Sequence, residues 1–180
     1  MLIPIRFSRG FIPFAAAFVL SVFSAQAAGT GLAGKYYTNT TFTGTAVSRT
    51  DTNINFTWPG SPIAGVDSNN FSVAWTGQVE PEFTELYTFY LTADDAARVW
   101  VDDQLLVGRT FFQGNGEMRG QMRLKAGHRV NLRVEFIGFT GNAGVKLEWA
   151  SPSRVREVVP MARLYPTTEI PNGGALMMEI

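Results

Sequence analysis

The residues most able to do chemistry in this chain are two adjacent aspartates, Asp94 and Asp95. Neighbouring carboxylates repel one another, so the pair is unfavourable unless a cation or several hydrogen-bond donors compensate the charge. Calcium suits such a pair because it is a hard cation that takes about six to eight oxygen ligands. The alternative is a plain turn in which Arg98 neutralises one carboxylate. The residues by themselves leave both interpretations open.

Aromatic side chains in two predicted loops are candidate ligand contacts. Phe111 and Phe112 lie among polar and glycine residues, and Phe139 lies in a glycine-rich stretch, residues 138–144. Pyranose rings have apolar C–H faces, and aromatic rings in binding sites pack against such faces. The three phenylalanines could therefore line the edge of a sugar-binding site. They could equally fold back over the core as lids.

Other catalytic and metal-binding patterns are missing from the sequence. There is no cysteine, and the one histidine, His128, lies in a predicted loop. Asp51 opens a stretch with the first spacings of an EF-hand, but Phe56 stands where glycine is required and Pro62 where the last glutamate is required. A glycosidase pair could hide among the 15 carboxylates, but nothing marks two of them out. The sequence therefore favours a protein that is not an enzyme.

The elements that would position these residues are strands, because apolar residues alternate with polar ones along most of the chain. The clearest example is Val130–Phe136, in which every second residue is apolar and the intervening residues are polar. Four tryptophans lie in such patterns, and we expect at least three of them in the core. Asp102-Asp103 predicts a turn, and Lys125–His128 predicts a short hairpin loop. The pattern predicts an all-β fold: an antiparallel two-sheet sandwich or barrel.

Composition limits the partners. The chain has 180 residues, 46% of them hydrophobic, which is enough for one domain with a core. Its 15 basic and 15 acidic side chains leave no electrostatic footprint for nucleic acid or for an anionic membrane. Without cysteine, stability must come from packing.

The two ends of the chain differ from the middle. Arg6 and Arg9 precede an apolar run, and Ala25-Gln26-Ala27 forms a small-residue cleavage pattern. Residues 1–27 are therefore predicted to be a signal peptide, so that the protein is secreted or periplasmic and is not inserted in the membrane after cleavage. We expect one β-sandwich domain over residues 28–166 and a loosely ordered tail over residues 167–180.

Six stretches in this order resemble the PA-14 domain, a β-barrel module named after a fragment of anthrax protective antigen. The resemblance covers about residues 31–166. The stretches that carry it are Gly31–Tyr37, Phe71–Gly77, Tyr87–Phe89, Asp94–Asp102, Leu124–Gly127 and Val145–Trp149.

The resemblance implies a calcium site. In the yeast adhesin branch of this family, two adjacent aspartates joined by a cis peptide hold a calcium ion, which chelates sugar hydroxyls. Asp94 and Asp95 match that pair, and Asn142 falls where the branch supplies a further ligand. This chain departs from the family at Ala96, where glycine is common; alanine would be strained there if the position needs a positive φ.

These observations lead to a hypothesis and an alternative. The hypothesis is a secreted, non-catalytic, lectin-like module that binds a glycan or polysaccharide with Ca²⁺ at Asp94, Asp95 and Asn142. Phe111, Phe112, Phe139 and Asn142 would contact the sugar. The alternative is a structural module of the cell envelope without a sugar site, whose partner is another surface protein.

Overall fold

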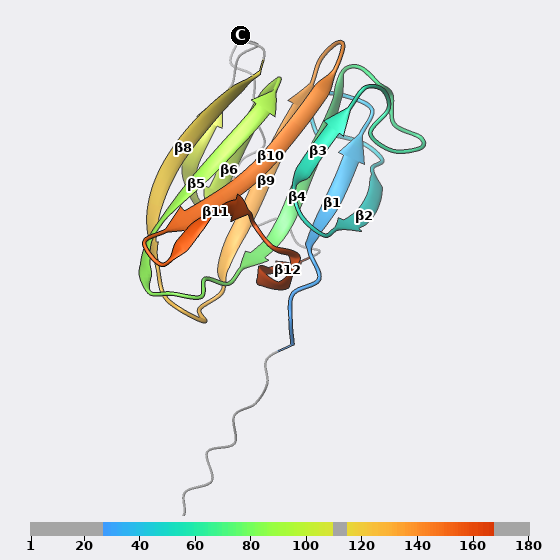
Figure 1. The fold of residues 1–180 in the computed structure, drawn as a ribbon. Coiled ribbons are helices and arrows are strands. Elements are labelled where there is room, and N and C mark those ends of the chain that lie inside the picture. Colours follow the sequence, from blue (N-terminus) through green and yellow to red (C-terminus); the bar gives the residue numbers. More distant parts are fainter. Residues whose placement is uncertain (1–26, 110–114, 168–180) are drawn as a thin grey trace, which may run out of the picture.

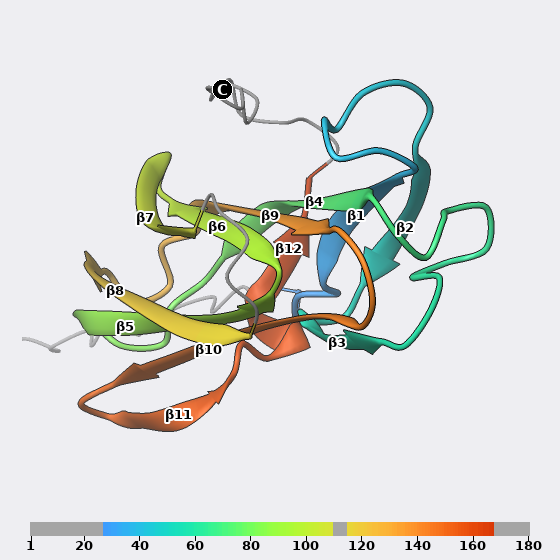
Figure 2. The same cartoon turned by 90° about the horizontal axis from the view of Figure 1, so that it is seen from above.

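The computed structural model describes residues 27–109 and 115–167. These residues form two antiparallel β-sheets that pack face to face (Figures 1 and 2), which confirms the predicted all-β sandwich. The one helical element in the described ranges is a short 3₁₀ helix, η1, at Met161–Arg163. No helix within these ranges has the length and apolar character needed to cross a membrane.

The larger sheet has seven strands in the order β2-β1-β4-β9-β6-β7, and β12 also pairs with β4. Its strands are β1 (Leu32–Tyr37), β2 (Val47–Asp51), β4 (Phe71–Val79), β6 (Ala96–Val101), β7 (Gln104–Arg109), β9 (Val130–Gly138) and β12 (Leu164–Pro166).

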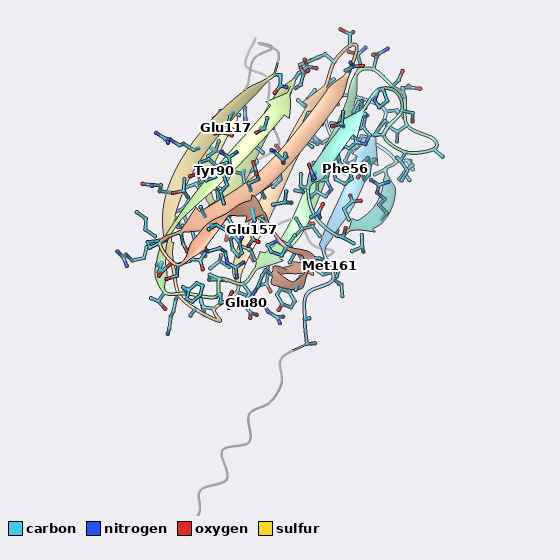
Figure 3. The ribbon with its side chains drawn as sticks, viewed as in Figure 1. Phe56, Glu80, Tyr90, Glu117, Glu157 and Met161 are labelled. Atoms are coloured by element: carbon cyan, nitrogen blue, oxygen red, sulfur yellow. The ribbon has the colours of Figure 1, made fainter. Side chains whose placement is uncertain are left out.

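The smaller sheet has five strands in the order β11-β10-β5-β8, and β3 also pairs with β10. Its strands are β3 (Asn55–Trp58), β5 (Glu85–Asp94), β8 (Gly116–Leu124), β10 (Ala143–Ser151) and β11 (Arg154–Val158). Its outer face is polar: Tyr90 and Glu117 lie there (Figure 3), and the Arg156 guanidinium lies 4.1 Å from the Tyr90 ring centre and pairs with Glu117.

The core lies between the sheets and is built from the apolar face of each strand. Trp75 and Trp149 are fully buried there, and Trp58 is nearly so, which confirms the expectation for three of the four tryptophans. The fourth, Trp100, is half-buried on the outer face of the seven-stranded sheet, where the Arg133 guanidinium lies 4.8 Å from its ring centre. Burial of such large rings is the main stabilising contribution, because apolar area removed from water scales with ring size.

The predicted hairpin at Lys125–His128 is wrong. These residues do turn, with Gly127 at φ 67° and the His128 N–H donating to the Lys125 carbonyl. However, the strands on either side belong to different sheets, because β8 pairs with β5 whereas β9 pairs with β4 and β6. Alternation locates a strand but carries no information about its partner, so a short loop alone does not define a hairpin.

Asp51 is a buried structural carboxylate. Its Oδ2 atom accepts hydrogen bonds from the Tyr36 hydroxyl at 2.6 Å and the Trp75 indole at 2.7 Å, and its Oδ1 atom pairs with Arg49 at 2.5 Å. Burial, followed by the hydrogen bond to Asp51, raises the pKa of the Tyr36 hydroxyl far above its ordinary value. Both oxygens are thus used inside the fold, which agrees with the rejection of an EF-hand at this segment.

Candidate functional site

The candidate site lies where the chain passes from one sheet to the other. β5 ends at Asp94 and β6 begins at Ala96, so Asp95 connects the five-stranded sheet to the seven-stranded sheet. Residues 139–142, which join β9 to β10, lie at the same end, because Gly144 pairs with Asp94. We call this end of the sandwich the loop end; it lies at the top of Figure 1.

The two aspartates have different environments. Asp95 is buried, with 3% of its surface exposed, and its Oδ2 atom accepts a hydrogen bond of 2.7 Å from the Phe139 backbone N–H. Asp94 is half-exposed and lines an open pocket. The peptide bond between the two residues is cis, as the family resemblance implies.

The charge on Asp95 is poorly compensated. Burial raises the pKa of its carboxyl above the ordinary value, the Phe139 N–H opposes this shift, and the adjacent Asp94 carboxyl adds to it. Within the described ranges, neither aspartate forms an ion pair with an arginine or lysine. Arg98 pairs across the sheet with Glu135 instead. Burial lowers the pKa of the Arg98 guanidinium, and the charge of Glu135 opposes that shift. The turn neutralised by Arg98 is therefore not what the structure contains.

The loop with residues 139–142 is fixed by three backbone contacts. The first is the hydrogen bond from the Phe139 N–H to Asp95. In the second, the Phe139 carbonyl accepts a hydrogen bond of 2.7 Å from the Asn70 N–H. In the third, the Gly141 N–H donates to the Asn69 Oδ1 atom at 3.1 Å. Asn70 and Gly141 both adopt a positive φ, at 53° and 88°. These contacts hold Asn142 at the loop end, exposed, one residue before β10 begins.

The backbone at Ala96 does not have the positive φ that would make alanine strained at this position. Ala96 is not among the described non-glycine residues with a positive φ, so alanine is unstrained at this position. It is the first residue of β6, and 2% of its surface is exposed. Replacing the glycine that is common in the family therefore leaves the backbone geometry next to the aspartate pair intact.

An open pocket of about 240 Å³ lies beside Asp94, on the outer face of the five-stranded sheet. Most of its lining side chains are hydroxyl, amide, carboxylate or amine groups, which present hydrogen-bond donors and acceptors to solvent. The lining also includes Phe56, which Figure 3 labels on β3. The lining residues are Asn55, Phe56, Thr57, Thr92, Asp94, Asn115, Gly144, Val145 and Lys146.

The predicted aromatic contacts are only partly located. Phe139 is half-buried at the loop end, and its backbone binds Asp95. Phe111 and Phe112 lie outside the described residues. The strands that flank them end near the site, because Arg109 pairs with Ala97 and Gly116 pairs with Ala93.

The donor set at the loop end fits a calcium ion better than a softer metal. The described ranges contain no group of three or more histidine, cysteine, aspartate or glutamate side chains that could hold a metal. An ion here would take the carboxylates of Asp94 and Asp95 and complete its shell with neutral oxygens, such as the Asn142 amide, carbonyls and hydroxyls. Ca²⁺ accepts such all-oxygen shells, and the buried charge on Asp95 is what a bound cation would relieve.

Sequence reasoning missed the residues that hold and line the site. Asn69 and Asn70 fix the loop, and Thr92 and Lys146 line the pocket. Two asparagines before an apolar strand are typical of a turn, so the sequence could have indicated a turn at Asn69 and Asn70. Thr92 and Lys146 are adjacent across β5 and β10, a relation that only the strand register reveals.

The structure is a β-sandwich with a pair of adjacent carboxylates at the point where the chain crosses from one sheet to the other. The PA14 domain matches residues 29–161, and the chain belongs to this family. It is 39% identical over 140 residues to the anti-sigma-I factor RsgI3 of Acetivibrio thermocellus, covering 77% of this chain and 22% of that protein.

Solved structures show the same fold. An anti-sigma factor domain-containing protein superposes with a TM-score of 0.76 at 36% identity, covering 81% of this chain and 50% of the other. A PA14 sugar-binding domain from an RTX adhesin gives a TM-score of 0.65 at 17% identity, covering 79% of this chain and 100% of that domain. The second likeness concerns the fold alone. This chain spans at most half the length of the two anti-sigma relatives.

Proposed function

We propose that this PA14 domain binds carbohydrate outside the cytoplasm through a calcium ion held at the loop end. The observation that carries the proposal is the buried Asp95 carboxylate, which lies next to Asp94 and has no basic partner among the described residues. Such a buried charge destabilises the fold unless a ligand compensates it. Asp94, Asp95 and Asn142 are the proposed calcium ligands.

The bound calcium would supply a Lewis-acidic contact for sugar hydroxyls. The chain's own residues would do the rest of the binding. Thr92, Asn55 and Lys146 present hydroxyl, amide and amine groups to the pocket beside Asp94, and these groups can orient further hydroxyls. Phe139, with Phe111 and Phe112 in the segment that follows β7, would pack against the apolar face of the ring.

The proposed setting is the cell surface or the extracellular space. Residues 1–27 have the pattern of a signal peptide, and the PA14 relatives include a domain of an adhesin and anti-sigma factors. For this chain we propose binding without turnover, because Asp94 and Asp95 are adjacent in sequence and are the proposed ligands of a cation, whereas the two carboxylates of a glycosidase lie on either side of a glycosidic bond.

A second candidate is a module that binds another envelope protein. The observation in its favour is that the relatives at 36% and 39% identity are anti-sigma factors, whereas the sugar-binding PA14 domain is 17% identical. In that case the loop end would carry no ligand, and Asp95 would only receive the Phe139 N–H.

A glycan array separates the two candidates. Residues 28–180, which include every described strand, are labelled and applied in millimolar calcium and again in excess chelator, as wild type, Asp95→Asn and Asp102→Asn. Asp102 is an exposed turn residue at φ 51°, where asparagine is equally well tolerated, so it is the matched control. The proposal predicts calcium-dependent signals that Asp95→Asn removes and Asp102→Asn keeps. Silence of the folded wild type in both buffers rejects it and favours the interaction module.

A further inference from the structure

A second open hollow lies on the outer face of the five-stranded sheet, away from the loop end. Its volume is about 430 Å³, and residues of β5 and β8 line it. Thr88 points outward from β5, because Tyr87 and Phe89 on either side of it lie in the core. We call this feature the β5–β8 hollow. Its lining residues are Thr88, Tyr90, Arg119, Gly120 and Gln121.

The β5–β8 hollow is separate from the pocket beside Asp94. The two have no lining residue in common. Arg156 on β11 marks the boundary between them. Its guanidinium lies 4.1 Å from the ring centre of Tyr90, which lines the hollow. The same guanidinium pairs with Glu117, which lies opposite Thr92 of the pocket (Figure 3 labels Tyr90 and Glu117). A ligand in the hollow would therefore contact a different set of side chains.

Two arginines of β8 on this face have no ion-pair partner. Arg119 lines the hollow, and Arg123 lies four residues further along the same face, opposite Leu86. Both arginines are exposed, and neither forms an ion pair within residues 27–109 and 115–167. At the usual strand rise their Cα atoms are about 13 Å apart. The hollow thus contains one unpaired positive charge and has a second just beyond it.

Glu117 and Glu148 lie on the same face as Arg119, but other cations neutralise them. Glu117 pairs with Arg156. Glu148 pairs with Arg156 at 2.6 Å and with Lys146 at 3.1 Å. The hydrogen bond from Arg156 holds the pKa of the Glu148 carboxyl below its ordinary value. Two carboxylates and two cations cancel within this network, so the charge of the β8 arginines is available to a ligand.

Neutral hydrogen-bonding groups lie between the two arginines. Gln121 stands between Arg119 and Arg123 on β8, and its Nε2 atom donates to the Thr88 Oγ1 atom at 3.0 Å. This bond uses one amide hydrogen of Gln121. The Gln121 Oε1 atom, its second amide hydrogen and the Thr88 hydroxyl hydrogen remain for a ligand. Such a mixture of donors and acceptors suits hydroxyl groups, which both donate and accept.

This order of charged and neutral groups fits a carboxylated polysaccharide. A guanidinium binds the planar carboxylate through two parallel hydrogen bonds. Arginines about 13 Å apart suit a chain whose charges are well separated. A nucleic acid duplex instead carries about one charge per 1.7 Å of its axis, which two arginines do not match. Sugar hydroxyls between the carboxylates would meet Gln121 and Thr88.

We infer that the β5–β8 hollow is a second, calcium-independent binding site, for a polysaccharide that carries carboxylate groups. Arg119 binds one carboxylate and Arg123 binds another further along the ligand. Gln121 and Thr88 bind the hydroxyls between them. None of the proposed calcium ligands belongs to this site, so the inference does not depend on the calcium site at the loop end.

Titration with alginate oligosaccharides in excess chelator tests the inference. Alginate consists of uronate units, and the chelator removes calcium from the loop end. Residues 28–180, labelled with ¹⁵N, are titrated as wild type, Arg119→Gln, Gln121→Leu and Lys35→Gln. Lys35→Gln is the matched control, because it removes the same charge from β1 of the other sheet.

The wild type should show saturable amide shifts at residues 86–90 and 119–123. Arg119→Gln should weaken the affinity about tenfold or more, because it removes a charge-assisted pair of hydrogen bonds. Gln121→Leu should weaken it less, because it removes only neutral contacts, and Lys35→Gln should bind like the wild type. No binding by the wild type, shifts centred outside β5 and β8, or an unchanged affinity of Arg119→Gln would each overturn the inference.

Two further ligands identify what the hollow recognises. Neutral cello-oligosaccharides lack carboxylates and poly-glutamate lacks hydroxyls, so both should bind more weakly than alginate. Poly-glutamate that binds as tightly as alginate would assign the hollow to an acidic protein and overturn the polysaccharide. Asp95→Asn should bind alginate as the wild type does, so failure of the calcium site and failure of this second site are distinguishable.

Discussion

Replacing Asp95 by asparagine should have opposite consequences with and without calcium. The change removes the buried negative charge but keeps an oxygen that can accept the Phe139 N–H, which lies 2.7 Å away in the wild type. In chelator the variant should be within about 1 kcal/mol of the wild type, or more stable, because the lost group is a charge that burial disfavours. In calcium the wild type should gain stability that the variant does not.

The size of that gain follows from linkage. A ligand bound only by the folded state, at about 100 times its dissociation constant, adds about 2.7 kcal/mol to the free energy of unfolding. For a domain of this size, each kcal/mol raises the midpoint of thermal unfolding by about 2–4 °C, so the expected rise is about 5–10 °C. The assay is thermal unfolding of residues 28–180 in millimolar calcium and in chelator, with Asp102→Asn as the control.

Three results would refute this reasoning in different ways. A wild type that does not respond to calcium removes the metal site and leaves the fold unaffected. A full calcium response in Asp95→Asn places the ion elsewhere. A loss of several kcal/mol for Asp95→Asn in chelator shows that the carboxylate stabilises the fold without metal, because removing a charge that burial disfavours should cost at most about 1 kcal/mol.

Three further substitutions test the surrounding structure by chemical denaturation. Gly34→Ala should lower the free energy of unfolding by about 1–3 kcal/mol, because the new Cβ would lie 2.6 Å from the Asp51 Oδ2 atom, which hydrogen bonds from Tyr36 and Trp75 hold in place. An unchanged midpoint of unfolding would contradict the rigidity of that cluster. Gly141→Val should lower the free energy of unfolding by about 1–2 kcal/mol, because a side chain is strained at φ 88°. It should also weaken calcium binding, because the same loop carries Asn142, the proposed amide ligand. Unchanged stability and unchanged calcium binding would show that the loop relaxes freely. Glu135→Gln should flatten the pH dependence of stability, because burial raises the pKa of this carboxyl against the effect of its neighbouring arginines. A carboxyl whose pKa is raised in the folded state adds to the free energy of unfolding below the ordinary glutamate pKa, and this contribution is lost as the pH rises through the folded-state pKa. If stability depends on pH in the same way in wild type and Glu135→Gln, the Glu135 carboxylate is not buried as described.

The strands were predictable because their chemistry is local. β9 shows perfect alternation from Val130 to Phe136, and the structure buries Leu132, Val134 and Phe136 as the pattern requires. What alternation could not give is the partner of each strand, as the crossing at Lys125–His128 shows. It also could not show that the outward-facing Glu135 is buried, because polarity indicates which face a residue takes and not what covers that face.

The aspartate pair was predictable as a candidate, but its surroundings were not. Adjacent carboxylates are visible in the sequence, and the family resemblance adds Asn142. The Phe139 N–H that binds Asp95 comes from a residue 44 positions away, and such a contact depends on the strand order. The assignment of calcium and of the three phenylalanines to a sugar site remains a prediction.

A calcium titration followed by amide chemical shifts shows directly whether the loop end binds the ion. Residues 28–180, labelled with ¹⁵N, are titrated with calcium and then with chelator. A calcium site at the loop end predicts saturable, reversible shifts at Asp94, Asp95 and residues 139–144, and none at the opposite turns around Gly127 and Ser153. Saturable shifts centred elsewhere, or none at millimolar calcium, would contradict a calcium site at the loop end.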